Sequence, residues 1–482
     1  MTRTEIRFLL NDRKVTLSEV AASDMVLDHL RLEQRLRGTK EGCAEGDCGA
    51  CTVLVGRLAP AGLVYEPVNA CIRPLATLDG CHVVTIEHLR GSDGGLHPVQ
   101  RAMVAYHASQ CGFCTPGFVM ALYALWMQTP HPSEAQIERA LQGNLCRCTG
   151  YAPIIRAALA MGDHGSTDPL VEERAQVTAT LEALRDGARV EVARGDSRAI
   201  LPASLADLAE LRAAHPQARI IAGATDVGLW VTKFLREMPL AIMIPHLDEL
   251  RAITETEDAL EIGALVNYEQ AHGPLTQAFP HMARYWDRIA GWQVRAMGTL
   301  GGNIANGSPI GDTPPPFIAL GATLVLRREN ERRVLPLEGF FMDYGKQDLR
   351  EGEFVESIHL PKPAPNTRHA AYKLSKRRDE DISAVAAGFA VTVQDGTITA
   401  ARLAFGGMAA TPKRAARAEA ALTGQPFTEA SFRNAMAALP EDFTPLSDMR
   451  ASADYRMRAA QNLLLRFWLE AQGQPATLED VA

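Results

Sequence analysis

The first 88 residues carry an alternation of apolar and polar positions that predicts short β-strands separated by turns. Ile6, Phe8 and Leu10 alternate with polar neighbours before a turn, and further strand patterns fall at 52–55 and 83–86. A helical pattern opens at Val26 and stops at Gly38. A twisted sheet carrying one helix is the β-grasp arrangement, so we expect residues 1–88 to form a β-grasp domain.

Between residues 89 and 162 the apolar period changes to 3.6, which predicts helices. Apolar stripes cover 99–107, 117–128 and 152–161, and Ser133 opens a capping box with Gln136 before another helix. We expect a small four-helix bundle here. Residues 163–195 begin with a turn-rich stretch and continue as a charged segment with little periodicity. We interpret that segment as a linker that forms a mobile tether.

Strand patterns alternate with short helices over 196–366, and Ala-rich helical stretches with a strand pair around Asp395-Gly396 follow over 367–482. The sequence therefore predicts an α+β multidomain protein. We expect a two-part α+β domain over 196–366 and a C-terminal α/β domain with an antiparallel sheet over 367–482.

Charge and hydropathy exclude several classes of function. The chain has 482 residues and a net charge of −8, so it lacks the basic footprint of a non-specific nucleic-acid binder. Its N-terminus has no secretory h-region, and no run reaches the ~18 apolar residues of a membrane span. We expect a cytoplasmic location without membrane attachment. In that reducing compartment clustered cysteines more often bind metals than form disulfides.

All nine cysteines lie in the first third of the chain. Cys43, Cys48 and Cys51 have the spacing C-x4-C-x2-C, and Cys71 follows, which is the plant-type [2Fe–2S] arrangement. The glycines of this segment favour a tightly wrapped loop with positive φ: Gly42, Gly46 and Gly49. A zinc site fits poorly, because zinc prefers paired C-x2-C knuckles. We interpret Cys81 as a small buried apolar residue rather than a ligand.

A second group of four thiols comes from Cys111-x2-Cys114 and Cys146-x-Cys148. Each pair lies next to a helix end, where the helix dipole favours a thiolate at the N-terminus. Four cysteines on helices can also hold zinc, so the residues alone leave iron–sulfur and zinc open for this group.

Two Gly-rich segments later in the chain are suited to a phosphate-bearing cofactor. Residues 221–228 are a strand running into a turn whose backbone amides can form an anion nest. The turn is not G-x-G-x-x-G, which disfavours a Rossmann site. Residues 298–312 are rich in Gly and Asn; the alternative there is a polar surface loop, although long loops of this kind are often functional.

Three ordered motifs make the chain resemble the molybdenum hydroxylase family. They are EGCAEGDCGAC at 41–51, QCGFCTPG at 110–117 and GNLCRCTGY at 143–151. The resemblance implies two different [2Fe–2S] clusters, with the helical one nearest a molybdopterin that Gln110 contacts. It implies these cluster ligands: Cys43, Cys48, Cys51, Cys71, Cys111, Cys114, Cys146 and Cys148.

The body of the chain resembles the FAD-binding domain of the same family, which makes 196–366 the FAD-binding domain. One departure is Ile289, where the family often has an aromatic residue against the flavin ring. The loop 377–381 would approach the flavin and NAD⁺, or else be a solvated charge run. The FAD contacts implied by the resemblance are Ile221, Ala222, Gly223, Ala224, Thr225, Asp226, Val227, Gly228, Ile289, Thr299, Gly302, Asn303, Asn306, Asp312, Val355 and Lys373.

No molybdenum-binding segment follows the flavin part, so we expect that segment on a partner large subunit, in an α2β2 heterotetramer. The domain order matches the small subunit of the family's bacterial xanthine-oxidising members. The resemblance thus implies oxidation of hypoxanthine and xanthine to urate, with electrons passing through both clusters and FAD to NAD⁺. The alternatives are an aldehyde- or N-heterocycle-oxidising enzyme of the family, and a stand-alone Fe–S/flavin electron carrier.

Overall fold

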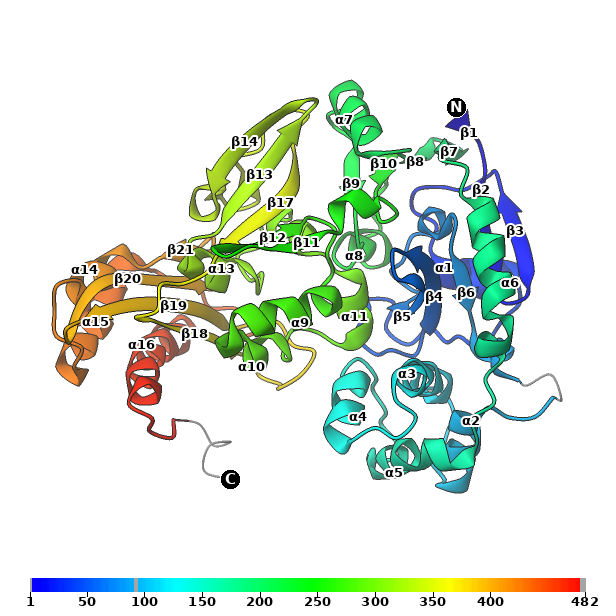
Figure 1. Cartoon of the computed structure of the whole chain (residues 1–482), viewed down its shortest axis with the longest axis horizontal. Coiled ribbons are helices and arrows are strands. Elements are labelled where there is room, and N and C mark those ends of the chain that lie inside the picture. The colour runs from blue at the N-terminus through cyan, green and yellow to red at the C-terminus, as the bar shows by residue number, and fades with distance from the viewer. Residues whose placement is uncertain (1, 91–93, 477–482) are drawn as a thin grey trace. The chain divides into compact units, whose positions relative to one another are not determined.

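A computed structural model describes residues 2–90 and 94–476, which form two compact units (Figure 1). The first unit takes in the described chain up to Glu249 together with Asn267–Glu269 and Ala290–Gly298. The second takes in Leu250–Val266, Gln270–Ile289 and the described chain from Thr299 onward. Residue 1, residues 91–93 of the predicted bundle and residues 477–482 of the predicted C-terminal domain lie outside the described residues.

The N-terminal part of the first unit is a five-stranded sheet with the order β3-β2-β6-β4-β5. The alternation seen in the sequence divides each strand between two cores. Phe8, Val53 and Val83 pack with the helical segment that follows β3, while Leu9, Leu54 and Val84 pack into the core shared with the helices of the bundle. The bounds are β2 (Ile6–Leu10), β3 (Arg13–Leu17), β4 (Thr52–Ala59), β5 (Gly62–Asn69), β6 (His82–Val84) and α1 (Val26–Asp28), which continues as a π-helical turn (His29–Glu33).

Four helices follow and form the predicted bundle, in cyan in Figure 1. The central one is buried along nearly its whole length, and the capping box at Ser133 is present, with Gln136 as its partner. The helices are α2 (Pro98–Ala105), α3 (Thr115–Gln128), α4 (Glu134–Leu141) and α5 (Ala152–Ala160).

The prediction of a mobile tether over 163–195 is wrong. Residues Pro169–Leu184 form the sixteen-residue helix α6, and Arg189–Arg194 form strand β7. Leu170, Val177 and Leu181 of α6 are buried in the core shared with the sheet and the bundle. The rest of the helix is mostly Glu, Arg, Gln, Thr and Ala, so its apolar stripe is too narrow to stand out in the sequence.

A second sheet of the first unit has the order β1-β7-β8-β10-β9. Its β8, β10 and β9 are parallel neighbours, and the N-terminal β1 adds to its edge in parallel with β7. Helices α7 and α8 connect the strands. The bounds are β1 (Thr2–Arg3), β8 (Ser197–Leu201), β9 (Arg219–Ile221), β10 (Leu240–Met243), α7 (Leu205–Ala214) and α8 (Val227–Thr232).

Helix α11 (Trp292–Met297) also belongs to the first unit, although it is distant in sequence from the rest of it. Trp292 is buried in the core that contains the bundle, and Met297 is buried in the core that contains Cys51 and Cys71. A single short helix therefore packs against both N-terminal domains.

The second unit contains an antiparallel sheet with the order β11-β12-β17-β13-β14, with short helices around it. These strands and helices form the second part of the expected two-part domain. The bounds are β11 (Ile253–Glu255), β12 (Ala259–Gly263), β13 (Thr323–Arg328), β14 (Glu331–Pro336), β15 (Phe341–Asp343), β16 (Lys346–Gln347), β17 (Phe354–Pro361), α9 (Tyr268–Ala278), α10 (Ala283–Trp286), α12 (Leu300–Ala305) and α13 (Pro314–Leu320).

The C-terminal part of the second unit is the expected antiparallel sheet with helices on it. The strands β19 and β20 meet at the turn Asp395-Gly396, as predicted. The bounds are β18 (Thr367–Leu374), β19 (Val385–Gln394), β20 (Thr397–Gly406), β21 (Lys413–Arg414), α14 (Ala416–Leu422), α15 (Glu429–Asp442) and α16 (Ala453–Ala471). The α+β multidomain prediction is confirmed.

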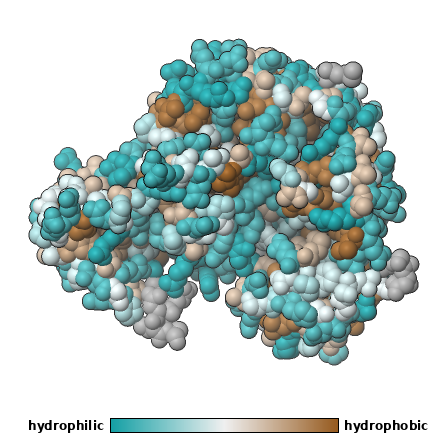
Figure 2. All heavy atoms as spheres, in the orientation of Figure 1, coloured by the Kyte–Doolittle hydropathy of each residue, from teal (hydrophilic) through white to brown (hydrophobic). Residues whose placement is uncertain are grey.

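Hydrophilic residues dominate the face seen in Figure 2, and apolar residues appear there in small groups. In the described chain, no helix has both the length and the apolar character needed to cross a bilayer.

Candidate functional site

The loop between the first helical segment and β4 brings Cys43, Cys48 and Cys51 next to Cys71. The sulfurs of Cys51 and Cys71 are 3.2 Å apart, and the backbone N–H groups of Glu45 and Cys48 each donate to Cys43 Sγ at 3.4 Å. Amides aimed at a ligand sulfur are the interactions that tune an iron–sulfur cluster. All four predicted ligands of the first group are therefore neighbours in space.

Hydrogen bonds within this group favour one of its thiols as the thiolate. Those from the Cys48 and Cys71 thiols lower the pKa of Cys43. The same hydrogen bond to Cys43, together with burial, raises the pKa of Cys48, and hydrogen bonds with Cys43 and Cys51 raise the pKa of Cys71. Iron is bound by the deprotonated sulfur, so Cys43 is the predicted ligand that its neighbours already favour in that form.

The loop glycines act in two ways. Gly46 and Gly49 adopt positive φ, 79° and 67°, as predicted. Gly42 does not; Ala44 does, with φ 54°. Gly42 is needed for space instead, because a Cβ there would lie 2.7 Å from Cys48 Sγ.

Cys81 lies apart from the four thiols in its hydrogen bonding. Its sulfur faces the carbonyl oxygens of Thr77 at 3.9 Å and Asp79 at 3.7 Å, and burial raises the pKa of this thiol. It packs into the core of the β-grasp domain, which agrees with its interpretation as a small buried residue.

The second group of thiols gathers in two pairs between the helices of the bundle. Cys148 Sγ donates to Cys111 Sγ at 3.7 Å, and Cys114, the N-cap of α3, is hydrogen-bonded to Cys146. Burial raises the pKa of Cys114 to about 12. For Cys146 burial opposes ionisation, but hydrogen bonds from Thr149 lower the pKa. Cys111 and Cys148 are exposed, as is Gln110 beside them.

Within residues 2–90 and 94–476, no three His, Cys, Asp or Glu side chains are arranged to hold a single metal ion. A [2Fe–2S] cluster contains two irons joined by sulfides, with a pair of cysteines on each iron. The four neighbouring thiols of the first group and the two thiol pairs of the second are compatible with that ligand set.

The two cysteine loops are joined by direct hydrogen bonds. Leu145 N–H donates to the Cys48 carbonyl at 3.1 Å, and Asn144 Nδ2 donates to the Gly49 carbonyl at 3.3 Å. Gly117 at the start of α3 also lies against Gly49, since a Cβ there would be 2.2 Å from the Gly49 oxygen. One hydrogen bond therefore links Cys48 to the residue before Cys146.

In the first unit, residues 221–228 form the predicted turn from β9 into α8. A Cβ on Gly223 would lie 1.8 Å from the Met297 carbonyl oxygen, so the turn packs tightly against the end of α11. Ala224 has φ 59° and its carbonyl accepts from Gly228 N–H at 2.7 Å. A Cβ on Gly228 would lie 2.7 Å from Ile72, the neighbour of Cys71. The turn is thus held beside the first cysteine group.

In the second unit, most of the other predicted flavin residues lie on or next to α12, at Asp312, and on strands β17 and β18. Thr299 caps α12 by accepting from Gly302 N–H at 3.1 Å, and Asn303 accepts from Thr313. The Asp312 carboxylate is 2.7 Å from Lys373 Nζ and accepts from Ser383 at 2.6 Å. Asn306 is the C-cap of α12, and Val355 lies buried on β17.

Ile289 is buried, just after α10. Two tryptophans lie three residues from it in sequence: Trp286 stacks on Phe317 with ring centroids 6.4 Å apart, and Trp292 is buried in the core that contains the bundle. The partly exposed loop 377–381 is closed by the backbone N–H of Arg377, which donates to Asp381 at 2.8 Å.

Sequence reasoning missed Ser383, which donates to Asp312 and accepts from Lys373 Nζ at 2.9 Å. It also missed the contacts of Gln293 with both cysteine loops. Neither residue lies in a local motif, and only the strand pairing and the placement of α11 bring them to their partners. No signal in a single sequence indicates these contacts.

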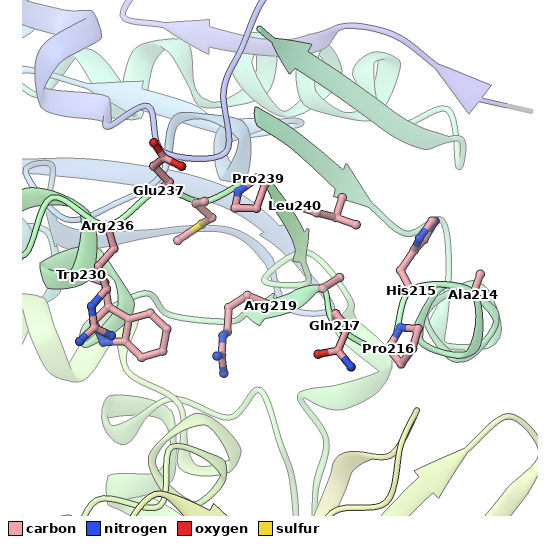
Figure 3. Close-up of a pocket in the computed structure, with 12 residues that line it drawn as sticks. Ala214, His215, Pro216, Gln217, Arg219, Trp230, Arg236, Glu237, Pro239 and Leu240 are labelled. Atoms are coloured by element: carbon pink, nitrogen blue, oxygen red, sulfur yellow. The ribbon is translucent and has the colours of Figure 1, made fainter. Parts of the chain in front are cut away.

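A cavity of about 540 Å³ opens at the amino ends of β9 and β10 (Figure 3). The guanidinium groups of Arg219 and Arg236 lie over the Trp230 ring, 4.8 and 5.2 Å from its centroid. None of the predicted site residues lines it, and it lies at the opposite end of β9 from the turn at 222–226. It is therefore not the predicted flavin turn.

Four family models match the chain in order. They are described as the 2Fe-2S iron-sulfur cluster binding domain, at residues 8–74; the [2Fe-2S] binding domain, at 85–159; the FAD binding domain in molybdopterin dehydrogenase, at 195–363; and the CO dehydrogenase flavoprotein C-terminal domain, at 370–471. The [2Fe–2S] and FAD domains named in the sequence analysis are thereby confirmed.

Similar proteins fall in two groups. Xanthine dehydrogenase of Emericella nidulans is 33% identical and matches 97% of this chain and 39% of its own length. That of Drosophila pseudoobscura is 34% identical over 88% of this chain and 36% of its own length. This chain thus spans about two fifths of the length of these curated relatives.

Among solved structures, a carbon monoxide dehydrogenase from Hydrogenophaga pseudoflava has TM-score 0.52 and 32% identity, over 55% of this chain and 93% of its own. Quinoline 2-oxidoreductase from Pseudomonas putida 86 has TM-score 0.51 and 28% identity, over 57% and 96%.

Proposed function

Because this chain belongs to the molybdenum hydroxylase family and carries its iron–sulfur and flavin domains, we propose that it is the electron-transfer subunit of a xanthine dehydrogenase. The observation that carries the proposal is the order of four matched domains in one chain. That order coincides with similarity to xanthine dehydrogenases along nearly the whole chain.

We propose that electrons enter at the second cysteine group. Cys111 and Cys148 are exposed, so this group can approach a molybdopterin on a partner large subunit, with Gln110 against the pterin. Large apolar side chains surround the group, with exposed fractions of 46% for Phe113, 38% for Leu145 and 39% for Tyr151. Exposed aromatic residues around a functional group are typical of protein interfaces. An α2β2 heterotetramer in the cytoplasm is part of the same proposal.

From there the hydrogen bond between Leu145 and Cys48 offers a direct connection between the two cysteine groups. The turn at 221–228 lies beside Ile72 and therefore beside Cys71. The chain's own residues thus form a continuous series from the exposed thiols to the predicted flavin turn. The cofactors supply the redox chemistry, and the protein supplies their positions and environment.

For FAD, the residues fit a dinucleotide in both units, taken separately. In the first unit, Gly223 and Gly228 allow the turn to lie close to its neighbours, and the amides of 223–226 would face a pyrophosphate. In the second unit, Lys373 and Ser383 each hold one oxygen of Asp312, and the remaining lone pairs of this fixed carboxylate would accept from a flavin hydroxyl. We propose that these residues would hold FAD, that FAD would supply two-electron transfer to NAD⁺, and that the loop 377–381 would face NAD⁺.

The test is reconstitution of the chain with its molybdopterin-bearing partner. With xanthine as substrate, we expect NAD⁺ reduction together with bleaching of the iron–sulfur and flavin absorbance. If purines leave those spectra unchanged while an aldehyde or an N-heterocycle bleaches them, the substrate assignment is wrong.

A second candidate is the electron-transfer subunit of another molybdenum hydroxylase. The solved structures of carbon monoxide dehydrogenase and quinoline 2-oxidoreductase favour it, since each matches more than half of this chain. Parallel assays with xanthine, quinoline and an aldehyde distinguish the candidates. Gel filtration of the native protein distinguishes both from a stand-alone carrier, which would elute without a pterin-bearing partner.

A further inference from the structure

One side chain outside the cofactor ligands contacts both cysteine loops. Gln293, on α11, donates from Nε2 to Thr52 Oγ1 at 3.0 Å and to Asn144 Oδ1 at 2.9 Å. Thr52 directly follows Cys51, and Asn144 lies two residues before Cys146. Both hydrogens of the Gln293 amide are therefore used, one on each loop.

The two contacts converge on a single carbonyl. Thr52 Oγ1 donates to the Gly49 oxygen at 2.6 Å, and Asn144 Nδ2 donates to the same oxygen at 3.3 Å. Because Asn144 uses its amide nitrogen on that carbonyl, its Oδ1 faces Gln293 and needs an N–H donor. This fixes the orientation of the Gln293 amide and leaves no role for a carboxylate at that position.

Gln293 is almost completely buried, at 1% exposure. Its Oε1 has no hydrogen-bond partner among the described residues and packs against Gly143, where a Cβ would come within 2.0 Å of it. Buried polar atoms are nearly always paired. A glutamine that leaves one acceptor unpaired, at a place where leucine or methionine would fill the space, points to a requirement for its two N–H donors.

The helix that carries Gln293 is itself fixed to the bundle. Arg295, fully buried, donates to Glu269 at 3.0 Å and to Gln142 at 2.6 Å. Glu269 also pairs with Arg139 of α4 at 2.7 Å. Charge-assisted hydrogen bonds of this kind hold α11 and the end of α4 in one register. Gln293 is therefore a rigid connection between the loops.

We propose that Gln293 is a positioning residue that sets the spacing of the two cysteine loops and, through it, the electronic coupling between the two clusters. This inference rests on the proposed function in so far as both loops carry [2Fe–2S] clusters. The residue touches neither set of ligand sulfurs; it acts through Thr52, Asn144 and the shared Gly49 carbonyl, and it holds in place the Leu145–Cys48 hydrogen bond.

The experiment compares Gln293→Met with Ser133→Ala in the full-length holoprotein. Methionine matches glutamine in size but donates no hydrogen bond. Ser133→Ala removes the side-chain N-cap of α4 and so loosens the bundle while leaving Gln293, the contacts of Arg295 and both loops intact. The readouts are the magnetic interaction between the two reduced clusters by low-temperature EPR, the midpoint potential of each cluster, and hydrogen exchange of residues 143–146.

In Gln293→Met we expect full iron and flavin content, loss of the splitting that arises from interaction between the reduced clusters, and faster hydrogen exchange at Leu145. In Ser133→Ala we expect the splitting to remain. Retained splitting in an iron-replete Gln293→Met protein overturns the inference. Equal loss in both variants also overturns it, because the cause would then be general loosening of the region.

A milder pair of variants covers failure of Gln293→Met to fold. Thr52→Val removes the acceptor of one Gln293 hydrogen bond and should weaken the splitting, while Thr52→Ser keeps the hydroxyl and should restore it. Identical spectra for an iron-replete pair overturn the proposal. If instead the two loops do not carry [2Fe–2S] clusters, the wild-type protein itself lacks the two [2Fe–2S] signals. That result would contradict the proposed function and is distinct from a failure of the Gln293 variants.

Discussion

Lys373 is the residue whose environment most clearly links stability to the predicted flavin contacts. Its ammonium group is 1% exposed and pairs with Asp312 at 2.7 Å, while Asp312 itself is 14% exposed. Replacing Lys373 by methionine leaves a carboxylate buried without its counter-ion, and breaking a buried pair in this way costs about 3–5 kcal/mol. We therefore expect Lys373→Met to lower the free energy of unfolding by that amount, measured by urea denaturation, and to reduce FAD retention.

Lys376→Met provides the control. Lys376 is exposed and donates only to the Met449 carbonyl, so its loss should change stability by less than about 0.5 kcal/mol. If both variants lose the same stability, or if Lys373→Met retains FAD as the wild type does, the Lys373 ammonium group is not what stabilises the Asp312 carboxylate and FAD binding.

At the residue scale, what could be predicted from sequence is what lies in short local patterns. The spacing of Cys43, Cys48 and Cys51 is set by one loop, so it can be read directly. Ser383 and Gln293 reach their partners only through strand pairing and through the return of α11 to the first unit. Their partners are many residues away, and no periodicity records such contacts.

At the scale of elements, the contact between α3 and the first cysteine loop requires a glycine. A Cβ on Gly117 would lie 2.2 Å from the Gly49 oxygen and 3.1 Å from the Ala50 Cα, and backbone atoms cannot move away as a flexible side chain can. Overpacking of this kind costs about 1–3 kcal/mol. We expect Gly117→Ala to lower the melting temperature and the iron content of the purified protein.

Gly339→Ala is the matched substitution at an open position. Its nearest neighbour would be Leu335 at 3.8 Å, an ordinary contact, so stability should stay within about 0.5 kcal/mol of the wild type. If Gly117→Ala has the melting temperature and the iron content of the wild type, then α3 and the first cysteine loop can move apart without a loss of stability.

Helix α6 shows where element prediction from the sequence failed. Leu170, Val177 and Leu181 are buried in the core and Leu184 packs against it. Arg174 and Arg185 donate to the carbonyls of Leu63 and Leu58. A helix held by so few apolar residues and by arginine contacts has the composition of a solvated segment. Packing against the sheet and the bundle stabilises this helix, because tertiary packing supplies most helical stability in proteins.

At the scale of the whole molecule, the chain leaves the first unit after Glu249 and returns to it twice. The resemblance of ordered motifs identified the iron–sulfur and flavin domains, and the family models agree with them. The division of the flavin residues between two units follows from the path of the chain. Hydrophobic periodicity describes each element separately and therefore contains no record of that path.

The first unit presents the surface through which electrons are proposed to enter. Phe113 lies between Cys111 and Cys114 with 46% of its surface exposed, and aromatic anchors of this kind contribute about 2 kcal/mol or more to an interface. We expect Phe113→Glu to weaken binding of the molybdopterin-bearing partner by about 30-fold, which is what 2 kcal/mol represents. Isothermal titration of the purified subunits measures the change, with iron content determined in parallel because Phe113 adjoins two ligands.

Phe234→Glu is the control: Phe234 is 63% exposed on the same unit but lies beside the Trp230 cavity, and its loss should leave binding unchanged. If iron-replete Phe113→Glu binds the partner as tightly as Phe234→Glu does, the exposed thiols of the second group are not where the partner docks, and the proposed direction of electron flow fails with it.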